Sequence, residues 1–297
     1  MRVAITGSSG MIGTALRASL SADRHEVLRL VRRPPESSDE VYWDPVAGWL
    51  NPAHLEGVEA VVNLSGANVG GQRWTRAYKR TLRDSRLSAT RTLAKALTEM
   101  TDRPRVLVSM SAAGIYGLAH GSDVLDEDEP AGDGFLADMC REWEAAAAPA
   151  EKAGIAVCHP RAHLIMTRHG GALARMLPWF RKGLGGPLAG GRQYWSHVSL
   201  SDVVRALRFL IETHGCSGPY NVAAPEPVTN AEFTRVLARE LGRPTLLPVP
   251  EFALRIRYGE FADDILVSLR LVSARLSDAG FEFEHPNARS VVAAGLR

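Results

Sequence analysis

Three glycines near the amino terminus constrain the fold of this chain most. Gly7, Gly10 and Gly13 are spaced GxxGxxG between an apolar run at 3–6 and a helical pattern at 11–20. At such a junction the first glycine permits a tight turn, the second lets the backbone approach a pyrophosphate, and the third lets helix and strand pack closely. Free N–H groups at the start of the helix then face the phosphates. We therefore predict a dinucleotide site rather than a purely structural turn, with contacts at Gly7, Ser9, Gly10, Met11, Ile12 and Gly13.

Short β-type runs alternate with helical patterns through the first half of the chain. The runs lie at 3–6, 26–31, 41–43, 60–65, 105–111 and 155–161, and helical patterns lie at 11–20, within 75–99 and around 137–152. This alternation predicts a Rossmann-type α/β fold, a doubly wound parallel sheet covered by helices on both faces.

After residue 162 the alternation loosens, and glycine and proline become frequent. We predict a dinucleotide-binding region at 1–161 and a smaller C-terminal α/β substrate region at 162–297, interleaved with the edge of the sheet. Ligands of open α/β sheets bind beyond the carboxyl ends of the strands. The second region is therefore expected to close over that edge.

The end of the second predicted strand indicates which dinucleotide binds. Proteins that prefer NAD usually place an acid there for the ribose 2′-hydroxyl, whereas this chain has Arg32 and Arg33. A guanidinium group pairs well with a 2′-phosphate. The sequence therefore predicts NADP(H), and the alternative is that these arginines only form a solvated loop.

The composition is that of an ordinary globular protein. Its 35 basic and 33 acidic residues leave a net charge of +2, which gives no support to a nucleic-acid or membrane partner. Three cysteines without a CxxC pair argue against disulfides and against a metal site. No signal-peptide core and no long apolar segment are present, so we expect a cytoplasmic protein.

Several longer segments carry a resemblance to a known family. Besides the glycine loop they include SMSAAGIYG (109–117), GGALARMLPWFRKGLGGPLAGGRQYW (170–195) and GPYNVAAPEPVTNAEF (218–233). The chain resembles atypical extended short-chain dehydrogenases/reductases of the NAD-dependent epimerase/dehydratase superfamily, in the branch called epimerase family proteins. The resemblance implies an oxidoreductase or epimerase acting on a sugar nucleotide or small carbonyl compound, and a homodimer is a further expectation. It also implies cofactor contacts at Leu64, Ser65, Gly66, Arg86, Ser109 and Arg161.

The catalytic pattern of that superfamily is incomplete here. Its active members use a Ser or Thr together with YxxxK, but none of the six tyrosines is followed by a lysine four residues later. The corresponding positions hold Phe135 and Met139, whose side chains cannot exchange a proton. The usual serine position holds Ala112. The remaining candidates for catalysis are Ser111, Ser109 and Tyr116.

Two functional readings follow. In the first, the protein is an NADP(H)-dependent oxidoreductase or epimerase with an unusual proton source. In the second, it is a catalytically inactive NADP(H)-binding sensor or regulator. The missing tyrosine and lysine favour the second reading, while aromatic residues of the substrate-type region, such as Trp179 and Trp195, favour the first. The fold alone does not separate them.

Overall fold

The computed structural model describes residues 1–118, 120–245 and 248–297. Within these residues an eight-stranded sheet forms the centre, and its strands pair in the order β12-β8-β5-β4-β1-β2-β3, with β6 also paired to β8. Every pairing in the sheet is parallel. This order confirms the Rossmann-type prediction. The strands are β1 (Arg2–Thr6), β2 (Glu26–Val31), β3 (Glu40–Tyr42), β4 (Ala60–Asn63), β5 (Val106–Ser109), β6 (Ser111–Ala112), β8 (Ala156–Ala162) and β12 (Gly218–Val222).

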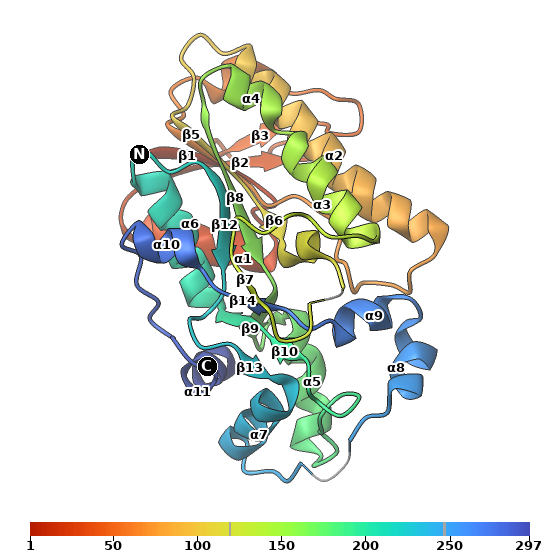
Figure 1. Cartoon of the computed structure of the whole chain (residues 1–297). Helices are drawn as coiled ribbons and strands as arrows, with labels where there is room; N and C mark the ends of the chain where they lie inside the picture. The colour runs from red at the N-terminus through yellow and green to blue at the C-terminus, as the bar shows by residue number, and fades with distance from the viewer. Residues whose placement is uncertain (119, 246–247) are drawn as a thin grey trace.

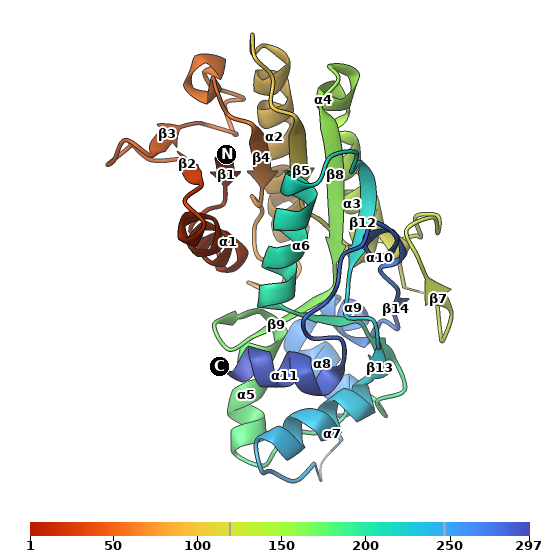
Figure 2. The same ribbon diagram turned by 90° about the vertical axis from the view of Figure 1, so that its left-hand side faces the viewer.

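Helices cover both faces of the sheet (Figures 1 and 2). Alternate residues of β1 face opposite sides, as the two-residue period of a strand requires. Val3 and Ile5 pack in one buried cluster with Leu16, while Ala4 packs in another with Leu93. The covering helices are α1 (Met11–Ala22) and α6 (Leu200–Glu212) on one face, and α2 (Arg76–Thr98), α3 (Phe135–Ala145) and α4 (Ala148–Lys152) on the other. The helix predicted around 137–152 is thus two helices.

Most of the C-terminal elements lie beyond the carboxyl ends of the strands, in the lower part of Figures 1 and 2. Leu177, Phe233 and Val291 belong to their shared apolar cluster. The helices are α5 (Gly171–Arg181), α7 (Asn230–Glu240), α8 (Glu251–Tyr258), α9 (Phe261–Leu266), α10 (Ala274–Asp278) and α11 (Ala288–Leu296). Within the described residues, three further sheets have two strands each. They pair β9 (Leu164–Thr167) with β11 (His197–Ser199), β10 (Tyr194–Trp195) with β13 (Val228–Thr229), and β7 (Val124–Leu125) with β14 (Arg270–Leu271). Two 3-10 helices span Pro52–Leu55 and Ala113–Tyr116.

The predicted regions 1–161 and 162–297 are not two separate domains. The chain returns to the main sheet after residue 161, because β12 pairs with β8 and α6 packs against α1. Asp202 at the start of α6 also accepts hydrogen bonds from the backbone N–H groups of Glu284 and His285, at 2.8 and 3.0 Å. These contacts tie the C-terminal segment to the sheet domain.

Candidate active site

Steric contacts explain the glycines of the loop after β1. Gly7 has a φ of +64°, and a Cβ there would lie 2.7 Å from the carbonyl oxygen of Leu64. A Cβ on Gly13 would lie 2.4 Å from the carbonyl oxygen of Gly7. The loop therefore packs against the end of β4 and against its own helix at distances that only glycine permits.

The amino terminus of α1 is open to an anion. The helix begins at Met11 after Gly10, no side chain caps it, and its first turn contains no acidic residue. Ser9 and Gly10 are exposed, while Met11 and Ile12 are half-buried. The uncapped N–H groups and the helix dipole favour a negatively charged ligand at this point.

The structure distinguishes the two arginines that follow β2. Arg33 donates two hydrogen bonds to the buried Glu40, from Nη1 at 2.9 Å and from Nη2 at 2.7 Å. Arg32 is exposed, and among the described residues the ion pairs of the 32–36 segment are those of Arg33 with Glu36 and Glu40. Of the two predicted contacts for a 2′-phosphate, only Arg32 has an unengaged guanidinium group.

A buried polar row joins the ends of the central strands. Thr6 Oγ1 donates to Asn63 Oδ1 at 2.7 Å, and Asn63 Nδ2 donates to Ser109 Oγ at 3.2 Å and to Thr90 Oγ1 at 2.9 Å. The backbone N–H of Leu64 donates to Thr6 Oγ1 at 3.1 Å. Ser109 is fully buried in this row. The row therefore fixes the start of the 64–66 segment, where cofactor contacts are predicted.

Arg86 is a buried cation on α2. Its Cζ lies 5.0 Å from the centroid of the Trp143 ring, and Nη1 donates to the carbonyl oxygen of Leu82 at 3.0 Å. Its Nε is buried and has no hydrogen-bond partner in the part of the chain that the structure describes. No carboxylate among the described residues pairs with it, and burial lowers its pKa. A Cβ on Gly66 would lie 3.1 Å from the guanidinium carbon, which places Arg86 beside the predicted cofactor segment.

The hydroxyls of Ser111 and Tyr116 belong to an interior network. Ser111 Oγ donates to Glu144 Oε1 at 2.6 Å, and Tyr116 donates to Asn221 Oδ1 at 2.7 Å. Arg161 connects the two, because it pairs with Glu144 and donates from Nη1 to the Tyr116 hydroxyl at 3.1 Å. Both hydroxyls are buried, and burial raises the pKa of Tyr116. In this geometry the hydroxyl protons of Ser111 and Tyr116 are already donated to Glu144 and Asn221, so proton donation to a substrate would require these bonds to break. Arg161 is likewise paired with Glu144.

The turn where YxxxK is expected is a wall of aromatic and aliphatic side chains. Phe135 begins α3, is half-buried, and packs edge-on against Trp74 with ring centroids 5.2 Å apart. Met139 is 2% exposed. Ala112, at the usual serine position, is half-buried. The two side chains at the YxxxK positions therefore cannot donate or accept a proton.

Burial lowers the pKa of two nearby histidines, His163 and His197, and raises the pKa of the thiol of Cys140. His163 follows β8, its Nδ1 is buried without a partner, and burial lowers its pKa to about 4. His197 is fully buried, with Nδ1 2.9 Å from the carbonyl oxygen of Trp195. Burial raises the pKa of the Cys140 thiol to about 12, which disfavours the thiolate form that reacts.

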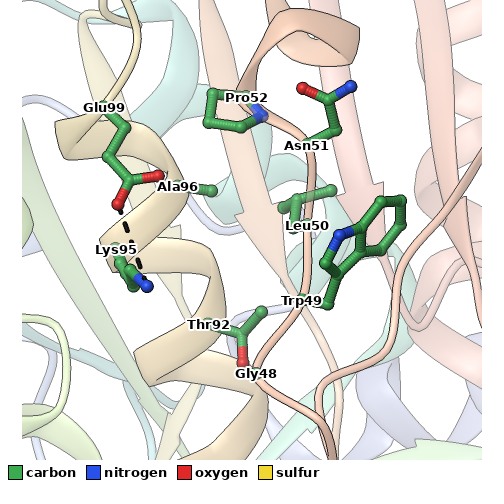
Figure 3. A pocket seen from close by; sticks show the side chains of 9 residues that line it. All are labelled: Gly48, Trp49, Leu50, Asn51, Pro52, Thr92, Lys95, Ala96 and Glu99. Carbon is green, nitrogen blue, oxygen red and sulfur yellow. Dashed lines mark ion pairs between the residues drawn. The ribbon is translucent and has the colours of Figure 1, made fainter.

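A surface cavity of about 340 Å³ lies elsewhere, between the 48–52 segment and the end of α2 (Figure 3). Lys95 and Glu99 form an ion pair on its rim, and Trp49 points outward from the opposite side. Lys95 is nine residues beyond Arg86 along α2, which corresponds to about 14 Å along a helix axis. This cavity is therefore separate from the cofactor segment.

Comparison with known proteins identifies the family. Residues 3–223 match the model of the NAD dependent epimerase/dehydratase family. The chain belongs to this family. Residues 249–294, which include α8 and α9, match a domain of unknown function. This pairing confirms the predicted superfamily with a C-terminal domain of its own.

Relatives match over nearly the full length. An epimerase family protein of Mycobacterium tuberculosis is 46% identical, covering 95% of this chain and 93% of its own. The crystal structure of human epimerase family protein SDR39U1 with NADPH is 30% identical with a TM-score of 0.91, covering 99% of both chains. A nucleoside-diphosphate sugar epimerase from Corynebacterium glutamicum is 32% identical with a TM-score of 0.81, covering 100% of this chain and 58% of that one. Among the described residues, no helix is both long and apolar enough to cross a membrane.

Sequence reasoning missed several residues that shape this site. Glu144 and Asn221 are recognisable only from their contacts with Arg161 and Tyr116, which lie far away in the chain. Asn63 directly precedes the predicted LSG segment, and its position at the end of an apolar strand was the available signal. Trp74 and Lys79 gave no sequence signal of their own.

Proposed function

We propose that this protein binds NADP(H) at the carboxyl end of its sheet and acts as an oxidoreductase or epimerase on a sugar nucleotide or small carbonyl compound. The unpaired, buried Arg86 carries the proposal. A buried guanidinium without an anion is costly, and a phosphate-bearing ligand beside Gly66 would offset that cost. The human relative crystallised with NADPH supports the same cofactor.

Different residues of the site would bind different parts of the cofactor. The loop from Gly7 to Gly13 and the amino terminus of α1 would hold the pyrophosphate. Arg32 would bind the 2′-phosphate, since Arg33 is already paired with Glu40. When bound, the nicotinamide supplies hydride chemistry, and the protein supplies orientation and exclusion of water.

Arg86→Met tests this assignment through two opposite effects. NADPH affinity should fall by about tenfold or more, since a hydrogen bond to a charged group contributes about 1.5–3 kcal/mol. The melting temperature without nucleotide should rise, because a buried unpaired charge is removed. Arg91→Met is the matched control, because Arg91 is an exposed arginine on the same helix. Unchanged affinity in Arg86→Met would refute the assignment.

The second candidate is an NADP(H)-binding protein without turnover. Phe135 and Met139 favour it, because neither can take part in proton transfer. NADPH oxidation measured across a panel of sugar nucleotides and carbonyl compounds separates the two. Oxidation with any member of the panel supports the enzyme, and tight binding without oxidation across the panel supports the sensor.

A further inference from the structure

A lysine from a neighbouring helix lies against the ring that occupies the tyrosine position. Lys79 Nζ is 5.0 Å from the centroid of the Phe135 ring. Lys79 lies near the start of α2, which is capped by Thr75, whose Oγ1 accepts a hydrogen bond from the backbone N–H of Tyr78. A positive charge is therefore present beside α3, although Met139 supplies none.

The helical period places Lys79 on the same side of α2 as the cofactor segment. Lys79 and Arg86 are seven residues apart, about two turns of helix, so their side chains leave the same face. Arg86 contacts the position of Gly66, and Lys79 is half-buried, while Arg76 and Arg80 beside it are exposed. Lys79 thus lies on the same face of α2 as Arg86, about two turns closer to the start of the helix.

The partner of Lys79 comes from the C-terminal region. Its Nζ donates a hydrogen bond to Glu260 Oε1, and Glu260 directly precedes α9. Phe261 stacks on Trp74 with centroids 5.1 Å apart, so the same corner of α9 also packs on the aromatic wall. The domain of unknown function thereby reaches the site and partly neutralises Lys79.

We propose that Lys79 supplies, from α2, the positive charge that relatives obtain from the YxxxK lysine, and that Glu260 sets how much of that charge the site experiences. This inference rests on the proposed NADP(H) site. The ammonium group of Lys79 would itself contact a carbonyl or hydroxyl oxygen of the substrate next to the nicotinamide.

The charge of the nicotinamide ring offers a test that needs no substrate. The ring is cationic in NADP+ and neutral in NADPH, so a nearby ammonium group weakens NADP+ binding relative to NADPH. In Lys79→Met, the ratio of the NADP+ to the NADPH dissociation constant should fall by about three- to tenfold, the range for a partly screened unit charge. In Glu260→Gln the ratio should rise, and Lys79→Arg should retain it.

Lys95→Met is the matched control, because Lys95 lies on the same helix and pairs with Glu99 at 3.9 Å. The ratio should not change in this variant. Melting temperatures of all variants identify any loss of fold. A ratio in folded Lys79→Met equal to that of the wild type would overturn the inference, since a purely structural ion pair affects stability alone. Failure of the wild type to bind either nucleotide would instead overturn the proposed function.

Discussion

Arg161 and Glu144 form a two-point ion pair in the interior, with Arg161 Nε and Nη2 each 2.9 Å from a different carboxylate oxygen of Glu144. The pair joins β8 to α3, and Glu144 also accepts a hydrogen bond from the hydroxyl of Ser111. Because both side chains are largely buried, the pair orders the floor of the site.

Glu144→Ala is expected to lower the free energy of unfolding by about 3–5 kcal/mol, because removing one partner leaves the buried guanidinium of Arg161 uncompensated. Urea denaturation measures the change. Asp138→Ala on the same helix is the control, since the ion pair of Asp138 with Arg141 is exposed and should contribute at most about 1 kcal/mol. Equal effects of the two substitutions would show that Glu144 is not a buried anchor.

Asp264 makes the stability of the protein depend on pH. Burial, together with the charges of Asp263 and Glu260, raises the pKa of Asp264 to about 7. The folded state therefore holds the proton more tightly than the unfolded state, so this group lowers stability progressively as pH rises from about 4 to about 7.

Asp264→Asn should accordingly stabilise the protein at pH 8 and have little effect near pH 4. Thermal unfolding at several pH values measures the difference. Asp138→Asn is the control, since Asp138 is exposed, pairs with Arg141 and should gain nothing at pH 8. A stabilisation of Asp264→Asn that does not depend on pH would contradict the burial of this carboxyl.

Restoring the missing lysine is expected to fail. Met139 is 2% exposed and packs among apolar residues. Met139→Lys should destabilise the fold by about 4 kcal/mol or more, because burial shifts the pKa of a lysine by up to about 3–5 units at 1.36 kcal/mol each. Met139→Leu conserves the volume and should cost less than about 1.5 kcal/mol. Equal stability of the two variants would show that the position opens toward solvent or ligand.

The local part of this structure could be predicted from the sequence. The run at 26–31 is a strand with the expected bounds, and the glycine spacing identifies the loop, because chain sterics act over a few residues. The return of β12 to the sheet could not be predicted, since it depends on Gly218 lying beside Cys158. That pairing is a contact between residues distant in the sequence.

The same limit applies to the site. Arg33 is predicted to bind phosphate, and Ser111 and Tyr116 to transfer protons, because of their residue types. Whether each side chain is free to do so depends on its hydrogen-bond partners. Each of these side chains is bound to another residue of the protein, Arg33 to Glu40 and Ser111 to Glu144 among them. Residue type thus indicated candidate groups, while tertiary contacts determined which of them remain unengaged.

Arg32 and Arg33 should differ in their effect on cofactor choice. Arg32→Ala is expected to remove most of a preference for NADPH over NADH, because its guanidinium group is unengaged and exposed. Arg33→Ala should leave most of the preference, since Arg33 is held by Glu40. Fluorescence titration of both variants with both nucleotides measures this. A loss of preference in Arg33→Ala alone would assign the phosphate contact to Arg33.

The central claim is that this chain binds NADP(H), and titration of the wild-type protein with NADPH and NADH tests it most directly. We predict that NADPH binds about tenfold or more tightly than NADH, because a charge-assisted bond to the 2′-phosphate contributes about 1.5–3 kcal/mol. Equal affinities for the two nucleotides, or no binding of either, would contradict the account.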